Sequence, residues 1–383
     1  MKILFTFYNP SGGMETLNRI RCEALQEQGV ECHLLYKIDG NGKKNIKNIK
    51  TFIFNDDAEL QALLQREQYD VIVVCTDSYL MESIRALGYK GSLIYEVQGL
   101  GTPETAKEII TRFEASIREH ATAILYPQTK HLKELMEAHL ADLPQFCFDD
   151  PLPVGKFGYE SYPAYHAPIM AWVGRIEANK NWREYLELGH RLSAQYPTLQ
   201  LWMFEDQSLF DPQEKAAFDQ FVAMLGLEPR LYRYDCVPHD LMADYYSIVG
   251  DSGGFLASTS ILEGFGYAVA EALLCRCPVL STDSDGIRRF IVHNETGKIY
   301  PRGNLLAAID EAVDLMRNVP VRESIRTAGM ARIRNHFSPE QYTKSFMGMI
   351  RKLHNDGNRN RIMKHGQSIV SRVLRSRSGA SQQ

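Results

Sequence analysis

The sequence predicts an α/β protein with two Rossmann-like, doubly wound domains and a cleft between them. Short apolar runs alternate with longer amphipathic stretches along the 383 residues. Most of these runs are apolar throughout, which is typical of parallel strands covered on both faces. This alternation begins again near residue 168, after a stretch rich in Pro, Gly and Tyr that indicates a linker. A chain of this length can form two complete cores.

The first domain is expected over residues 1–160. It opens with the apolar run Lys2–Tyr8, and the amphipathic stretch Met14–Gln28 predicts the first crossover helix. Strands that alternate with helices in this way form parallel sheets. Further strands are predicted at Cys32–Tyr36, Val71–Cys75, Ser92–Val97 and Ala123–Tyr126.

The second domain is expected over residues 161–336, with a crossover helix at Trp182–Gln195. Apolar residues near helical spacing predict another helix within residues 337–357, and residues 358–383 form a basic tail. The strands of this domain are predicted at Pro168–Val173, Leu199–Phe204, Gly254–Thr259 and Pro278–Ser281.

The bulk composition excludes several classes of protein. A net charge of −4 argues against a general nucleic-acid binder. Seven cysteines without framework spacing suit a reducing cytosol, and neither a signal peptide nor a run of about 20 apolar residues is present. We therefore expect a cytoplasmic protein. The basic tail allows two interpretations, a solvated terminus or a peripheral contact with anionic lipid at the inner membrane surface.

The most informative string runs from Glu263 to Glu271, between an apolar strand and a helix. Its glycines, Gly264 and Gly266, let the backbone approach a ligand closely. The start of the helix offers free N–H groups to a phosphate, and the carboxylates at both ends can accept hydrogen bonds from sugar hydroxyls. This arrangement suits a nucleotide-sugar, whereas the alternative is an ordinary loop with solvated carboxylates.

The same string resembles the signature of family 4 glycosyltransferases, which are retaining enzymes of GT-B fold. The downstream segments Cys277–Asp283 and Glu295–Pro301 fit this family as well. The resemblance spans most of the chain and is most specific over residues 168–302. It implies that the helix after residue 337 returns to the first domain.

Two cations, Arg175 and Lys180, lie on the turn after the first strand of the second domain. At this spacing they can converge on one pyrophosphate, and they resemble the phosphate-gripping segment of the family. They would stabilise the charge of the departing diphosphate, so we expect Arg175, Lys180 and Glu263 to be the catalytic residues. The alternative is a pair of solvated cations at a helix start.

Two positions in the first domain also resemble donor-binding positions of the family. Gly12 and Gly13 follow the first strand and resemble its N-terminal glycine loop. Gln98 stands where many members carry a histidine near the donor sugar. An amide can still form a hydrogen bond with a sugar hydroxyl, but it cannot transfer a proton at neutral pH.

No metal site or cofactor is expected. Asp283 and Asp285 fit the metal-binding Asp-x-Asp pattern of other glycosyltransferases, but they lie late in the chain, where this family has an ordinary loop. Histidines and cysteines lack metal-ligand spacing. We expect surface or packing roles for His120, His131 and His239.

The resemblance implies transfer of a hexose from a nucleotide-diphosphate donor to a glycan, a lipid-linked sugar or a small molecule, as in carbohydrate biosynthesis. A UDP-sugar is favoured over a GDP-sugar. Glu271 would accept from the ribose hydroxyls and Glu263 would contact the sugar. The donor would further contact Gly12, Gly13, Gln98, Gly264, Phe265, Gly266 and Tyr267. A nucleotide-sugar epimerase of the same fold and a non-catalytic binding subunit are the alternatives.

Overall fold

The computed structural model describes residues 1–355 except Lys156, Ala164 and Asp211. Residues Met1–Tyr342 form one compact unit that contains two parallel sheets. A separate unit begins at Thr343, and residues 339–355 are helical. The basic tail, residues 358–383, lies outside the described residues, and the domain boundaries stated above stay predictions.

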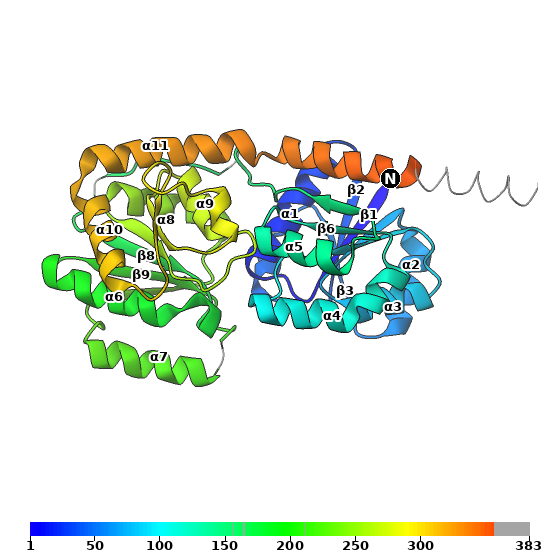
Figure 1. The fold of residues 1–383 in the computed structure, drawn as a ribbon, viewed down its shortest axis with the longest axis horizontal. Helices are drawn as coiled ribbons and strands as arrows, with labels where there is room; N and C mark the ends of the chain where they lie inside the picture. The colour runs from blue at the N-terminus through cyan, green and yellow to red at the C-terminus, as the bar shows by residue number, and fades with distance from the viewer. Residues whose placement is uncertain (156, 164, 211, 356–383) are drawn as a thin grey trace, which may run out of the picture. The chain divides into compact units, whose positions relative to one another are not determined.

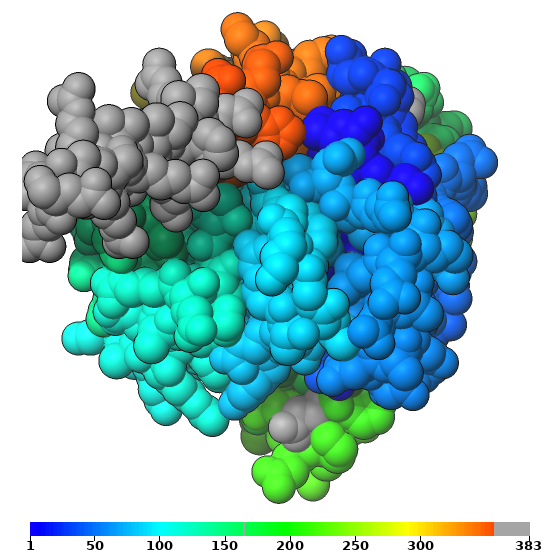
Figure 2. Space-filling view, turned by 90° about the vertical axis from the view of Figure 1, so that its right-hand side faces the viewer, coloured from blue at the N-terminus to red at the C-terminus, as the bar shows by residue number. Residues whose placement is uncertain are grey.

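The first sheet has seven strands in the order β3-β2-β1-β4-β5-β6-β7, all parallel. We call this sheet with its helices the N-terminal lobe (Figure 1, blue to cyan), and its surface fills most of Figure 2. The strands are β1 (Lys2–Phe7), β2 (Glu31–Tyr36), β3 (Lys50–Ile53), β4 (Val71–Cys75), β5 (Ser92–Glu96), β6 (Ala123–Tyr126) and β7 (Gln145–Cys147).

The second sheet has six strands in the order β10-β9-β8-β11-β12-β13, again all parallel. This sheet with its helices is the C-terminal lobe (Figure 1, green to orange). The strands are β8 (Ile169–Val173), β9 (Gln200–Glu205), β10 (Leu231–Asp235), β11 (Phe255–Ser258), β12 (Val279–Thr282) and β13 (Lys298–Tyr300).

Helices connect successive strands, as parallel sheets require. In the N-terminal lobe they are α1 (Gly12–Gln26), η1 (Asn41–Asn45), α2 (Asp57–Glu67), α3 (Ser78–Ala86), α4 (Pro103–His120) and α5 (Lys130–His139). In the C-terminal lobe they are η2 (Ala178–Lys180), α6 (Trp182–Gln195), α7 (Pro212–Leu225), α8 (His239–Asp251), α9 (Tyr267–Leu274), η3 (Gly286–Arg289), α10 (Leu305–Arg317) and α11 (Val319–His336).

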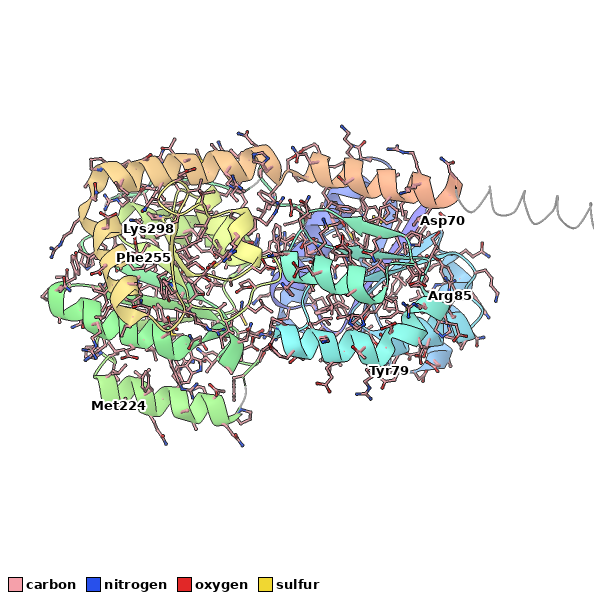
Figure 3. All side chains as sticks on the ribbon, viewed as in Figure 1. Asp70, Tyr79, Arg85, Met224, Phe255 and Lys298 are labelled. Carbon is pink, nitrogen blue, oxygen red and sulfur yellow. The ribbon has the colours of Figure 1, made fainter. Side chains whose placement is uncertain are left out.

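Both faces of the second sheet are buried. Successive side chains of a strand point to opposite faces, so each strand contributes to two separate cores. On β8, Ile169 and Ala171 join a core with residues of α8, α9 and α11. Met170 and Trp172 join a separate core with residues of α6, α7 and α10. Figure 3 shows the contrast between Phe255, which is fully buried on β11, and Met224, which is exposed on α7.

The architecture confirms the predicted fold class. Every strand expected from the sequence is present, and Trp182–Gln195 is a helix with the predicted bounds. Four strands were not predicted, namely β3, β7, β10 and β13. Each of them is the edge strand of its sheet.

Candidate active site

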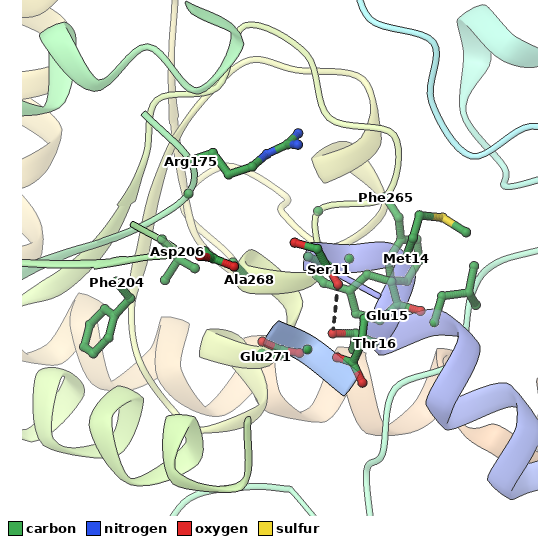
Figure 4. A pocket seen from close by; sticks show the side chains of 18 of the residues that line it. Ser11, Met14, Glu15, Thr16, Arg175, Phe204, Asp206, Phe265, Ala268 and Glu271 are labelled. Atoms are coloured by element: carbon green, nitrogen blue, oxygen red, sulfur yellow. Dashed lines mark hydrogen bonds between the residues drawn. The ribbon is translucent and has the colours of Figure 1, made fainter. Parts of the chain in front are cut away.

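A pocket of about 730 Å³ lies at the ends of the strands and is lined by both lobes (Figure 4). Residues after β1, β2, β4, β5 and β7 supply one wall, and loops after β8, β9, β10 and β11 supply the other. Open parallel sheets bind ligands at this edge. The structure brings together in this one pocket all the residues predicted to be catalytic or donor-binding: Gly12, Gly13, Gln98, Arg175, Lys180, Glu263, Gly264, Phe265, Gly266, Tyr267 and Glu271.

The start of α9 offers an anion site to this pocket. Gly266 caps the helix with a φ of 89°, a left-handed conformation that favours glycine. Among the described residues, no backbone carbonyl accepts from the N–H groups of Tyr267 and Ala268. Unpaired N–H groups and the helix dipole together attract a negatively charged ligand.

Glu263 and Lys180 form a partly buried ion pair in the same wall. Lys180 Nζ lies 2.6 Å from Glu263 Oε1. The hydroxyl of Ser260 donates to that same oxygen, also at 2.6 Å. The Glu263 carboxylate is therefore fixed by two donors, and Lys180 is held at the pocket by its charge.

Asn179 connects the η2 turn, which carries Lys180, to the loop that carries Glu263. No pattern in the sequence predicted this role. Its backbone oxygen accepts from Ile261 N at 2.8 Å. Its side chain donates to the oxygen of Leu262 at 3.1 Å and accepts from the nitrogen of Leu262 at 3.2 Å. Three hydrogen bonds thus fasten the turn of η2 to the loop that carries Glu263.

Arg175 is less constrained than Lys180. Its side chain is 54% exposed, and its ion pair is with Glu177 at 3.2 Å. Figure 4 shows the guanidinium extended, away from the other labelled side chains. The two predicted cations therefore line the same pocket, but Lys180 is held in place whereas Arg175 is accessible to an incoming anion.

Glu271 is 5% exposed on α9 and accepts from His239 Nε2 at 2.8 Å. The hydroxyl of Tyr246 lies at 3.5 Å from its second oxygen. His239 was expected to have a surface or packing role; in the structure it lines the pocket and forms a hydrogen bond with Glu271, a predicted binding residue. His239 and Glu271 belong to different βα units, so no local spacing in the sequence could link them.

Gln98 and Gly264 bring the two lobes into backbone contact. A Cβ atom placed on Gly264 would lie 1.9 Å from the backbone oxygen of Gln98. The side-chain Nε2 of Gln98 donates to Glu96 Oε1 at 3.0 Å and to Asp150 Oδ1 at 2.9 Å. The sequence did not single out Glu96 or Asp150, which are both buried.

The predicted glycine loop begins α1. Gly12 has a φ of 59°, and a Cβ atom on Gly13 would lie 3.3 Å from the ring of Tyr267. The hydroxyl of Tyr267 donates to the oxygen of Pro151 at 3.2 Å. The N-terminus of α1 therefore lies next to the side chain of Tyr267, the first residue of α9.

The two aspartates of the Asp-x-Asp pattern, Asp283 and Asp285, have protein partners. Asp283 pairs with Arg288 at 2.7 Å, and Asp285 accepts from both the backbone and the ring of His131 at 2.8 Å. Asp206, Asp235 and Cys236 hold three potential metal-ligand atoms within 4.8 Å of one another. Burial, Asp206 and Asp235 raise the pKa of the Cys236 thiol to about 12.

Two solved structures share the fold of this chain. Sucrose-phosphate synthase from Thermosynechococcus elongatus has a TM-score of 0.78 at 16% identity, covering 93% of this chain and 100% of that one. HepE from Anabaena, in complex with UDP and glucose, has a TM-score of 0.76 at 16% identity, covering 92% and 100%. The protein is thus of the GT-B class, with two Rossmann-like halves.

A second comparison concerns the C-terminal lobe. Residues 164–332 match the family model described as glycosyl transferases group 1. This match confirms the resemblance drawn from the string Glu263 to Glu271, which lies within the matched residues.

Curated relatives match over shorter stretches. The 2-deoxystreptamine N-acetyl-D-glucosaminyltransferase of Niallia circulans is 23% identical over 178 residues, 46% of this chain and 43% of that protein. The phosphatidyl-myo-inositol mannosyltransferase of Mycobacterium leprae is 35% identical over 74 residues, 19% of this chain and 20% of that protein. The chain thus spans less than half the length of these relatives. Within the described residues, each helix is too short or too polar to cross a bilayer.

Proposed function

We propose that the protein transfers a hexose from a nucleotide-diphosphate-sugar to an acceptor hydroxyl, with the anomeric configuration retained. One observation carries the proposal: a single pocket contains the Lys180–Glu263 pair, the open start of α9, and Glu271 held by His239. A cation and free N–H groups suit the diphosphate, and two separated carboxylates suit the hydroxyls on either side of it.

In this proposal Glu271 accepts from the ribose and Glu263 contacts the sugar. Lys180, Arg175 and the N–H groups at the start of α9 stabilise the charge that develops on the diphosphate as the glycosidic bond breaks. The acceptor oxygen attacks from the face that the diphosphate leaves, and the departing phosphate oxygen takes its proton. The protein contributes mainly position and charge stabilisation.

The donor we favour is a UDP-sugar. The HepE structure, which has the same fold, contains UDP and glucose, and this is consistent with such a donor. The acceptor class stays open among glycans, lipid-linked sugars and small molecules. Metal-independent transfer and a cytoplasmic location, with peripheral membrane contact through the basic tail, belong to the proposal as well.

Release of nucleoside diphosphate tests the proposal. The protein is incubated with UDP- or GDP-sugars and an acceptor panel in buffer containing EDTA, and the product is examined by NMR for the anomeric configuration. We expect acceptor-dependent release and a retained configuration. Isomerisation of the donor without an acceptor would instead indicate an epimerase, and donor binding without turnover would indicate a binding subunit. A strict requirement for a divalent cation would contradict the metal-free reaction.

A further inference from the structure

A buried polar network lies behind the pocket wall of the N-terminal lobe, and the proposed reaction does not use it. It consists of Arg21 on α1, Glu96 at the end of β5, Gln98 two residues later, and Asp150 after β7. Arg21, Glu96 and Asp150 are each 3% exposed or less. Only Gln98 and Asp150 reach the pocket lining.

Arg21 and Glu96 form an ion pair that is held in place within the network. Nη1 of Arg21 lies 2.7 Å and 2.9 Å from the two oxygens of Glu96. The guanidinium also lies 4.0 Å above the ring of Phe5, which keeps it in place. Both oxygens of Glu96 accept from the arginine, so this carboxylate acts as an acceptor toward its other neighbours as well.

The Arg21–Glu96 ion pair determines the orientation of the Gln98 amide. Its Nε2 atom has two hydrogens, one for Glu96 Oε1 at 3.0 Å and one for Asp150 Oδ1 at 2.9 Å. The flipped amide would place its oxygen against the carboxylate oxygen of Glu96, and two acceptors at this distance repel each other. The amide oxygen, Oε1, makes no hydrogen bond within the described chain, and it is not among the polar atoms sealed from solvent.

We propose that Glu96 and Asp150 are positioning residues that make Gln98 a hydrogen-bond acceptor only, so that the pocket selects an uncharged sugar with a free hydroxyl at this point and rejects a uronic acid. This inference rests on the proposed function. A hydroxyl can donate to Oε1, whereas a carboxylate has no hydrogen to donate and would bring a second acceptor against the amide oxygen.

The backbone places Gln98 at the sugar end of the proposed donor site. Its carbonyl oxygen touches Gly264, the residue that follows the Glu263 of the ion pair. Glu271, at the proposed ribose end, closes the far end of the string that begins at Glu263, and His239 of α8 holds it there. Asp150 adds to the positioning, because its Oδ1 accepts the second hydrogen of the Gln98 amide at 2.9 Å.

Calorimetry on the full chain tests the inference with UDP, UDP-glucose and UDP-glucuronic acid, and with GDP, GDP-mannose and GDP-mannuronic acid as a second set. We expect the neutral sugar nucleotide to bind the wild type at least about tenfold more tightly than the matching uronic acid. Gln98→Met keeps the length of the side chain but removes the acceptor. It should weaken the neutral sugar nucleotide about 3- to 10-fold and leave the bare nucleotide within about twofold.

A second pair of variants separates positioning from folding. Asp150→Asn still offers an oxygen to Gln98 Nε2, so its affinity for the sugar nucleotide should equal that of the wild type. Asp150→Ala releases the amide and should weaken the sugar nucleotide as Gln98→Met does, again without changing the affinity for the bare nucleotide. Thermal unfolding of both variants checks that the lobe is intact.

The outcomes distinguish this inference from the function on which it rests. If UDP or GDP binds but the uronic acid binds as tightly as the neutral sugar, the selection by Gln98 is wrong. The same follows if Gln98→Met weakens the bare nucleotide as much as the sugar nucleotide. If neither nucleotide binds the wild type, the proposed function itself fails and the inference fails with it.

Discussion

At the residue scale, the position of Lys180 depends on Glu263 and the position of Glu263 depends on Ser260. The single oxygen Oε1 of Glu263 receives both donors. The pair is only partly buried, with side-chain exposures of 21% and 15%. A diphosphate entering the pocket can therefore share the ammonium without removing it from its carboxylate partner.

Replacement of Lys180 by Ala is expected to lower turnover about 10²- to 10³-fold, the range seen when one preorganised donor to a developing charge is removed. Steady-state rates with saturating donor measure the effect. Lys130→Ala is the matched control, since this lysine is 78% exposed on α5 and should leave the rate unchanged. Equal rates for both variants would remove Lys180 from the diphosphate site.

Glu271→Gln keeps the shape of a buried side chain but removes its charge. We expect the affinity for the nucleoside diphosphate to fall about 3- to 10-fold, because hydrogen bonds to a charged acceptor are worth about 1.5–3 kcal/mol and an amide keeps part of that energy. Calorimetry with UDP measures the change. Glu295→Gln, on an exposed loop, serves as the control. An unchanged affinity would exclude Glu271 from the ribose site.

The carboxyl of Asp150 gives stability a pH dependence of definite sign. Burial raises its pKa in the folded protein, whereas the unfolded chain loses this proton above about pH 4. Above that pH the unfolded state binds fewer protons, so the free energy of unfolding falls as pH rises, by at most about 1.4 kcal/mol per pH unit.

Asp150→Asn removes this contribution. Urea unfolding of both proteins from pH 5 to pH 8 should show the variant gaining stability relative to the wild type as pH increases. The substitution can also change the free energy of unfolding by an amount that does not depend on pH. Such a change does not affect the difference between the two slopes of free energy against pH. Parallel pH profiles would mean that Asp150 is ionised in the folded protein.

Local patterns in the sequence predicted the residues that follow strands but not their partners. Glu263, Lys180 and Glu271 stand beside glycines and strand ends, where a pattern is readable. His239, Asp150 and Asn179 act through hydrogen bonds to residues from 32 to 83 positions away, and no spacing rule covers such distances. The two lobes had to fold before these contacts existed.

At the scale of elements, burial decided which strands the sequence could predict. The central strands are apolar along their whole length because both faces are covered; β4, for example, is buried at every position. The missed edge strands have mixed or short sequences, and neither β3 nor β10 contains a buried residue. An edge strand has one neighbour and a weaker apolar pattern, so it resembles a loop.

The loop between β11 and α9 is expected to tolerate very little change. Gly264→Ala would place a methyl group 1.9 Å from the carbonyl oxygen of Gln98, so the loop must move away from the N-terminal lobe. We expect lower donor affinity and a destabilisation of about 1–3 kcal/mol, the usual range for overpacking. Gly155→Ala, where a Cβ meets nothing within 4 Å, is the control for the loss of a glycine. If both variants bind donor equally well, the close contact has no role in the site.

At the scale of the whole molecule, contacts between the lobes lie beside the pocket as well as within it. Lys44 Nζ donates to the oxygen of Cys236 at 3.1 Å, and His131 of the N-terminal lobe binds Asp285 of the C-terminal lobe at 2.8 Å. A ligand that touches the glycine loop and α9 together adds a further link between the lobes. Ligand binding should therefore stabilise residues 1–342 as one unit.

Thermal unfolding measures this link. With UDP at 100 times its dissociation constant, binding contributes about 2.7 kcal/mol, which corresponds to a rise of about 4 °C for a unit of this size. At the same UDP concentration the double variant Arg175→Ala and Lys180→Ala should show a much smaller rise. ATP at equal concentration tests whether any polyphosphate suffices. An identical shift for wild type and variant would place the nucleotide elsewhere.

The contact between Gly264 and Gln98 also limits how descendants of this gene can vary. Every codon change that replaces Gly264 adds at least one carbon atom where 1.9 Å is available. The opposing atom is a peptide oxygen, which all twenty amino acids carry, so no substitution at position 98 can create room. Compensation would need a shift of whole backbone segments, and lineages should lose this glycine only together with the geometry of the cleft.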